Sequence, residues 1–259
     1  MAKEVPTMVF NDSEIEQFIR EGYVVLRRAF SSEVAEECRE FVWKQVPLWA
    51  DCKTYGQPMV QIQRGFGCAP FNQIMNQRLA SGLDQVVGVN RWKAPAVYGW
   101  WSLLLPGFPG PGGWHVDGGQ FRSSGHLTDH HHALVTLFLF SDVGPGEGGT
   151  AMIRGSHLTV ARTVADARSG SNWDDLKPVL SAAGALNPSE SEIAHLVGQV
   201  GDVALMHPFL IHGFGANHGS RIRFACNPLV ELRDNAQLER TDGGYSAVEL
   251  ALRKGMGLE

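Results

Sequence analysis

Apolar positions near the N-terminus of this chain follow a helical spacing. Segment 15–19 places its apolar side chains on one stripe, and Gly22 is a fitting stop for a helix. Ser13 and Glu16 have the spacing of a capping box, which marks the start of a helix. The pattern predicts a first helix, followed by a strand over residues 23–26.

The pattern then changes from helical stripes to short apolar runs. A second stripe from about Ser32 to Val46 predicts another helix, and an amphipathic segment from Ser246 to Arg253 predicts a last one. After residue 90, apolar runs are cut by glycine and proline, and they cover residues 96–105, 134–140, 203–207 and 222–230. Runs of this kind are typical of a barrel or a jelly roll.

Composition bounds the class of protein. The 259 residues contain no internal repeat or low-complexity linker, so we expect a single domain over residues 1–259 with one substantial core. A net charge of −5 argues against nucleic acid as a partner. No apolar stretch approaches the roughly 18 residues of a membrane span, and the start lacks the apolar region of a signal peptide. Four cysteines without paired spacing predict a reducing, cytoplasmic setting.

Candidate chemistry begins with His115 and Asp117, which are separated by one residue and flanked by glycines. On a strand, residues two apart project to the same side, so both could reach one ion. An apolar run from Val203 leads to His212, as expected of a buried strand that carries a ligand at its end. Two imidazoles and one carboxylate form the facial triad of non-haem Fe(II) oxygenases. Alternatively, His115 is a surface histidine and Asp117 is a turn residue in a glycine-rich loop, and neither binds a metal.

Arg221 and Arg223 alternate with apolar residues in the run that follows, so we expect both to share one face of a strand. A buried arginine needs an anion, and its planar guanidinium fits a carboxylate bidentately. The pair therefore predicts an anchor for an acidic co-substrate. A solvated edge strand is the alternative.

The chain resembles the phytanoyl-CoA dioxygenase family of Fe(II)/2-oxoglutarate oxygenases nearly from end to end. Four blocks carry the likeness in order along the sequence. They are residues 15–26, then His115 with Asp117, then Gly148-Gly149-Thr150 leading to Gly155-Ser156-His157, and last Gly201-Asp202 with His207-Pro208, His212-Gly213, Asn217 and Arg223-x-Ala225.

The resemblance implies a fold and a reaction. The fold is an all-β core with flanking helices, arranged as a double-stranded β-helix (jelly roll, cupin-like). The reaction hydroxylates or desaturates a small organic metabolite, while 2-oxoglutarate and O2 are converted to succinate and CO2. A non-catalytic jelly-roll protein that binds a small acid or a metal is the alternative, and the substrate and the oligomeric state stay open.

The resemblance also implies roles for individual residues. Fe(II) is expected on His115, Asp117 and His212. Arg223 follows the distal histidine by eleven residues, as the co-substrate arginine of the family does, and Arg221 is the second candidate. Two further positions belong with this site, with Thr150 near the co-substrate and His207 as a packing residue or a support outside the ligand set.

Other features have two readings. Trp92, Trp100, Trp101 and Trp114 either line a substrate pocket or pack in the core, and Trp114 is the best pocket candidate because it adjoins His115. His130, His131 and His132, with His126 nearby, could form a second metal cluster. Consecutive residues do not share a face, which favours a solvated loop or a lid over residues 120–132.

Overall fold

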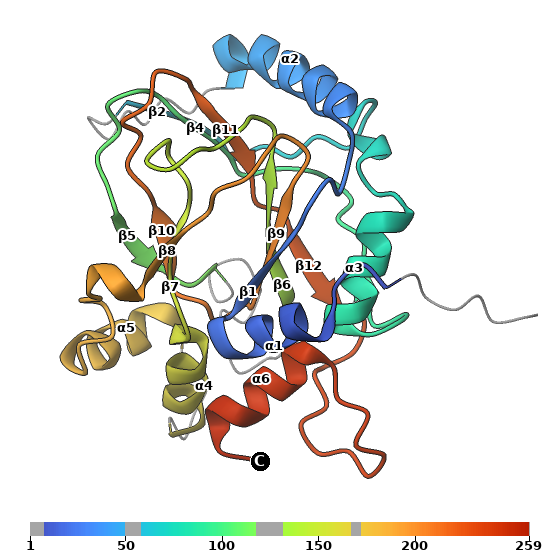
Figure 1. Cartoon of the computed structure of the whole chain (residues 1–259), viewed down its shortest axis with the longest axis vertical. Helices are drawn as coiled ribbons and strands as arrows, with labels where there is room; N and C mark the ends of the chain where they lie inside the picture. Colours follow the sequence, from blue (N-terminus) through green and yellow to red (C-terminus); the bar gives the residue numbers. More distant parts are fainter. Residues whose placement is uncertain (1–7, 50–57, 118–131, 167–171, 259) are drawn as a thin grey trace, which may run out of the picture.

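The computed structural model describes residues 8–49, 58–117, 132–166 and 172–258. Figure 1 shows the strands in the centre of the molecule and the helices around them. The α-helices are α1 (Asp12–Glu21), α2 (Ser32–Trp49), α3 (Gln77–Val87), α4 (Ser156–Asp166), α5 (Trp173–Ala182) and α6 (Ala247–Met256), with short 3-10 helices at Phe71–Gln73 and Glu190–Glu192. Within the described ranges, no helix combines the length and the hydropathy that crossing a membrane requires.

The strands are β1 (Tyr23–Leu26), β2 (Met59–Ile62), β3 (Trp92–Lys93), β4 (Trp101–Leu104), β5 (Gly112–His115), β6 (His132–Leu139), β7 (Ala151–Ile153), β8 (Ile193–His195), β9 (Val203–Met206), β10 (His212–Phe214), β11 (Arg223–Cys226) and β12 (Leu229–Leu232). They form two antiparallel sheets. The larger has the order β1-β9-β6-β11-β4-β2, with β12 pairing both β6 and β3, and the smaller has the order β5-β10-β7-β8. No pairing between described strands joins the sheets, so the core is open and not a closed barrel. The predicted all-β core with flanking helices is confirmed.

The larger sheet is buried on both faces, which explains its continuous apolar runs. In β9, Val203 and Leu205 belong to the core that the sheet shares with the helices, whereas Ala204 and Met206 pack with Met152 of the smaller sheet. Side chains alternate between the two faces of a strand, so one run supplies both layers. The layer between the sheets is where the candidate site lies.

The helices α1, α3 and α4 pack against α6 at one end of the larger sheet (Figure 1). Their buried side chains include Phe18 of α1 and Leu83 of α3. An ion pair fastens α6 to the segment before β3, because Arg91 donates to both carboxylate oxygens of Glu249, which is 1% exposed. Each fully buried apolar side chain contributes about 1.5–3 kcal/mol, so this helical layer supports the sheet from outside.

Local structure departs from the sequence-based expectations at the first helix and in the run over residues 222–230. The capping box of the first helix is formed by Asn11 and Glu14, so the prediction for Ser13 and Glu16 was wrong. The apolar run over residues 222–230 forms two strands instead of one, because it is interrupted at Asn227-Pro228. A proline has no N–H to donate to a β-ladder, and it restricts the residue before it.

Candidate active site

His115 and His212 are neighbours on two adjacent strands of the smaller sheet. His115 is the last residue of β5, His212 is the first of β10, and the two are direct partners in the antiparallel register. Their ring centroids are 4.5 Å apart. Each Nδ1 lies within hydrogen-bond distance of the carbonyl two residues earlier, at 2.6 Å for Gly113 and 2.9 Å for Leu210. Because a carbonyl only accepts, Nδ1 carries the proton and both Nε2 atoms can bind a metal.

The prediction that His212 lies at the end of the strand that begins at Val203 was wrong. The apolar run from Val203 ends as strand β9 at Met206, and a short loop separates it from β10. His212 therefore opens a strand of the smaller sheet and does not close a strand of the larger one. The glycine that follows it, Gly213, permits a close approach to β5, since a Cβ there would lie 2.2 Å from the Gly112 carbonyl oxygen.

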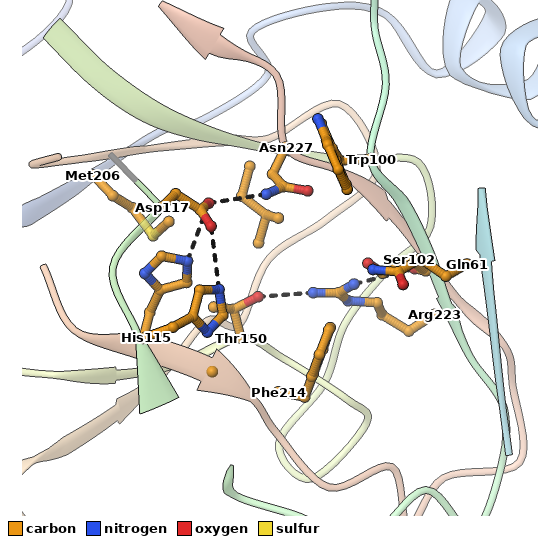
Figure 2. Close-up of a pocket in the computed structure, with 13 residues that line it drawn as sticks. Gln61, Trp100, Ser102, His115, Asp117, Thr150, Met206, Phe214, Arg223 and Asn227 are labelled. Atoms are coloured by element: carbon orange, nitrogen blue, oxygen red, sulfur yellow. Dashed lines mark hydrogen bonds and ion pairs between the residues drawn. The ribbon is translucent and has the colours of Figure 1, made fainter. Parts of the chain in front are cut away.

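Asp117 lies two residues beyond the end of β5, and not on the strand that the sequence predicted. Its carboxylate is nevertheless directed at both histidines, with Oδ1 3.2 Å from Nε2 of His115 and Oδ2 3.4 Å from Nε2 of His212 (Figure 2). Burial raises the pKa of the Asp117 carboxyl, but the charge of His212 and hydrogen bonds from both imidazoles hold it well below its usual range. The carboxylate is therefore ionised at neutral pH, as metal binding requires.

The three side chains together can hold a metal ion. One ligand atom from each residue can be chosen so that all three lie within 4.8 Å of one another. Burial lowers the pKa of His115, but its hydrogen bond to Asp117 and the charge of that carboxylate outweigh this effect and raise it. Two imidazole nitrogens and one carboxylate oxygen suit a first-row transition metal such as Fe(II), and they leave coordination positions open for other ligands.

Arg223, the first residue of β11, is buried without an acidic partner. It is 2% exposed, and its terminal nitrogens donate to the Ser102 carbonyl at 3.2 Å and to the Thr150 hydroxyl at 2.8 Å. Its Nε has no hydrogen-bond partner in the described part of the chain, and no carboxylate there pairs with it. Burial lowers the pKa of Arg223 to about 10, so the guanidinium is still charged at neutral pH. A buried, uncompensated cation is costly, and an anionic ligand would relieve that cost.

A single cavity of about 180 Å³ contains both the three candidate ligands and Arg223. Figure 2 shows Asp117 and His115 on one side of it and Arg223 on the other, with Thr150 bonded to the guanidinium. Its described lining residues come from both sheets and are Gln61, Trp100, Ser102, His115, Asp117, Leu137, Thr150, Met206, His212, Gly213, Phe214, Arg223 and Asn227. The arrangement places a metal site and an anion site on opposite walls of one chamber.

Arg221 does not face this cavity. Its side chain is 60% exposed, with a 2.9 Å ion pair to Glu147 and a longer one of 3.9 Å to Asp142. Strand β11 begins at Arg223, so Arg221 precedes the strand. The prediction that the two arginines share one face of a strand was therefore wrong. Arg221 is therefore a surface residue, and Arg223 is the arginine at the cavity.

Of the four tryptophans considered for a substrate pocket, Trp100 is the one that lines the cavity. Trp101 is fully buried in the core, and the indole of Trp92 donates to Asp84. Trp114, the pocket candidate favoured by its place beside His115, packs partly buried against the core instead. Alternation explains the outcome, because Trp114 and His115 are neighbours on a strand and project to opposite faces.

His207 packs away from the cavity. It is 1% exposed, its Nδ1 accepts the backbone N–H of Phe209 at 3.1 Å, and its ring centroid lies 4.9 Å from that of His157. This placement agrees with the expectation that His207 is a packing residue. The possible metal cluster of His126, His130, His131 and His132 lies outside the described part of the chain, as residues 118–131 and the side chain of His132 are not described. The predicted lid over residues 120–132 lies outside it for the same reason.

Three polar residues of the cavity were missed in the sequence, namely Gln61, Ser102 and Asn227. Gln61 and Ser102 are register partners on β2 and β4. Asn227 follows β11, and the alternation that begins at Arg223 places it on the same face, so this period-two signal could have identified it. Segment 59–62 carries no comparable signal.

Residues 62–225 match the family model described as Phytanoyl-CoA dioxygenase (PhyH), which is well over half of the chain. The chain belongs to the phytanoyl-CoA dioxygenase family. This phytanoyl-CoA dioxygenase family member is a 2-oxoglutarate-dependent dioxygenase, and its His115, Asp117 and His212 form a group that could hold a metal ion. No functionally curated protein matches it.

Solved structures share the fold of this family member at low sequence identity. The epimerase SnoN from nogalamycin biosynthesis, in complex with Fe3+, alpha ketoglutarate and nogalamycin RO, is 16% identical with a TM-score of 0.59 over 90% of this chain and 86% of its own. EctD from S. alaskensis, with 2-oxoglutarate and 5-hydroxyectoine, is 18% identical with a TM-score of 0.56 over 89% and 79%. HygX from Streptomyces hygroscopicus, with nickel and 2-oxoglutarate bound, is 16% identical with a TM-score of 0.55 over 92% and 95%. At these identities the likeness shows the fold.

Proposed function

We propose that this dioxygenase hydroxylates or desaturates a small organic metabolite, with Fe(II) held by His115, Asp117 and His212 and with 2-oxoglutarate bound by Arg223. The observation that carries the proposal is the state of Arg223. Its guanidinium is buried, charged and without an acidic partner among the described residues, and it lines the same cavity as the three ligands. A dicarboxylic co-substrate would satisfy Arg223 with one carboxylate and keep its 2-oxo acid end for the metal.

The residues around these groups have distinct tasks in this scheme. Thr150 and the Ser102 carbonyl orient the guanidinium by accepting two of its N–H groups. Leu137 and Met206 contribute apolar walls that limit the water reaching the chamber. When bound, Fe(II) supplies the redox chemistry that oxidises a substrate C–H bond, while 2-oxoglutarate is converted to succinate and CO2. The protein positions the reactants and holds the Asp117 carboxylate in its ionised, metal-binding form.

A small-molecule substrate fits the relatives that share the fold. SnoN was solved with nogalamycin RO, and EctD with 5-hydroxyectoine. These ligands support a metabolite as substrate for this chain, in place of a nucleic acid or a membrane. We also propose that residues 1–259 work as one oxygenase domain, since the two sheets build a single cavity.

Succinate formation tests the proposed function. The purified protein is incubated with Fe(II), 2-oxoglutarate and O2, with and without mixtures of metabolites, and succinate and substrate-derived products are measured by mass spectrometry. We expect succinate that requires both metal and 2-oxoglutarate, together with a product that has gained one oxygen atom or lost two hydrogens. Binding of both ligands without any succinate, in every mixture, would favour the non-catalytic binding protein.

A further inference from the structure

Each candidate metal ligand has a hydrogen-bond partner that is not itself a candidate ligand. For the two histidines these partners are the backbone carbonyls of Gly113 and Leu210. For Asp117 the partner is the carboxamide of Asn227, whose Nδ2 donates to Oδ2 at 3.1 Å (Figure 2). Partners of this kind set the orientation of metal ligands and tune their affinity for the ion.

We propose that Asn227 is a positioning residue that fixes the Asp117 carboxylate for metal binding. The inference rests on the proposed function, because it takes Asp117 as a ligand. His115 and His212 are register partners within a sheet, but Asp117 lies beyond the end of β5, so no β-ladder fixes its backbone. Its carboxylate therefore needs a tether from another element, and Asn227 supplies one from the larger sheet.

Asn227 is itself rigidly supported. It directly follows β11, and its backbone N–H donates to the Gly99 carbonyl at 3.3 Å. The next residue, Pro228, restricts Asn227 to an extended backbone. The Pro228 carbonyl accepts both the backbone N–H and the hydroxyl of Thr136, which is fully buried. The backbone that carries the carboxamide is thus fixed by the larger sheet.

The tether engages one oxygen of the carboxylate. Oδ2 accepts the Asn227 hydrogen bond, whereas Oδ1 lies against Nε2 of His115. Rotation of the carboxylate would break the bond between the part-buried Asn227 amide and the buried Asp117 oxygen, a cost of about 1–3 kcal/mol. The same strand also places Arg223, four residues earlier and on the same face. One strand therefore sets the distance between the co-substrate anchor and the tether of the carboxylate ligand.

The test measures metal affinity without turnover. Isothermal titration of the metal-free full chain with Co(II) compares wild type with Asn227→Leu, which keeps the branched shape of the side chain and removes the donor. The matched control is Gln61→Met, which makes the same kind of change to a carboxamide of the same cavity that has no hydrogen bond to the three ligands. We expect Asn227→Leu to raise the Kd for Co(II) by about 10- to 100-fold and Gln61→Met to leave it unchanged.

Thermal unfolding of the metal-free variants separates positioning from folding. A positioning role predicts weaker Co(II) binding by a variant whose Tm stays close to that of wild type, and Asn227→Ala repeats the measurement if the leucine variant does not fold. Unchanged affinity in a folded Asn227 variant would overturn the inference. An equal loss in Gln61→Met, or failure of both Asn227 variants to fold, would overturn it as well. If wild type binds no Co(II), or Asp117→Ala binds it equally, the proposed metal site fails instead.

Discussion

Gly213 approaches Gly112 so closely that a Cβ on Gly213 would lie 2.2 Å from the Gly112 carbonyl oxygen, whereas a Cβ on Gly112 would meet nothing within 4 Å. Gly213 lies in β10 with His212, and Gly112 lies in β5 with His115. The contact is therefore one-sided. It excludes a side chain on β10 next to His212, and it leaves room for one on β5.

A methyl group at Gly213 should therefore push β5 away from β10 and separate His115 from His212. We expect Gly213→Ala to lower the free energy of unfolding by about 1–3 kcal/mol, as overpacking does, and to weaken Co(II) binding. Urea denaturation and isothermal titration measure the two effects. Gly112→Ala is the matched control and should change neither. Equal stability of the two alanine variants would show that the close approach is not rigid.

Arg223 should control the affinity for 2-oxoglutarate. A bidentate, charge-assisted pair is worth on the order of 2–4 kcal/mol when partly buried, so Arg223→Lys should raise the KM for 2-oxoglutarate by roughly 30-fold or more. The matched control is Arg221→Ala, because Arg221 is exposed and pairs with Glu147 at the surface. Succinate formation measured over a range of 2-oxoglutarate concentrations gives both KM values. A normal KM in Arg223→Lys with a raised one in Arg221→Ala would reverse the assignment.

Removal of any one candidate ligand should abolish turnover. We expect no succinate from His115→Ala, Asp117→Ala or His212→Ala, because two side chains no longer define the site. His207→Ala should keep part of the activity, since His207 packs in the core and does not line the cavity. Assays at saturating Fe(II) and 2-oxoglutarate compare the four variants. Full activity in His212→Ala with none in His207→Ala would exchange their roles.

The layer structure could be predicted from the sequence because each apolar run reports burial on both faces of a strand. The run from Val203 shows this, with alternate residues in different layers. The residues that converge on the cavity could also be named, because His115, Asp117, His212 and Arg223 are side-chain types with specific chemistry. Neither inference required knowledge of which strands pair.

What the sequence could not provide depends on strand ends and on pairing between distant segments. Arg221 and Arg223 have the same spacing pattern, and only the start of β11 decides which of them is buried. Asp117 reads as a strand residue, but β5 stops two residues before it. The bond from Asn227 to Asp117 joins residues 110 positions apart, so no local pattern reports it.

His157 and His207 form a buried pair outside the candidate site, and both resist protonation. Burial lowers the pKa of His157 to about 4, and burial together with the repulsion that a protonated His157 would exert lowers the pKa of His207 well below its ordinary value. The hydrogen bonds agree with neutral rings. Nε2 of His157 lies 3.1 Å from the Ile19 carbonyl, and its Nδ1 has no partner among the described residues that could accept a second proton. Protonation of Nδ1 of His207 would break its bond to the Phe209 N–H.

The buried pair predicts a loss of stability in mild acid. The unfolded chain takes up protons on both histidines as the pH falls below about 6.5, while the folded protein resists until about pH 4 at His157. The free energy of unfolding should therefore fall with decreasing pH, with each histidine contributing up to about 1.4 kcal/mol per pH unit. Urea denaturation between pH 7 and pH 5 measures the slope of the free energy of unfolding against pH, above the range in which most carboxylates titrate.

His157→Gln should reduce this slope if it folds, and His207→Gln is the second variant. His218→Gln is the control, because His218 is exposed and should leave the slope unchanged. Slopes that are the same in wild type and in both buried-site variants would show that the pair does not govern the acid sensitivity.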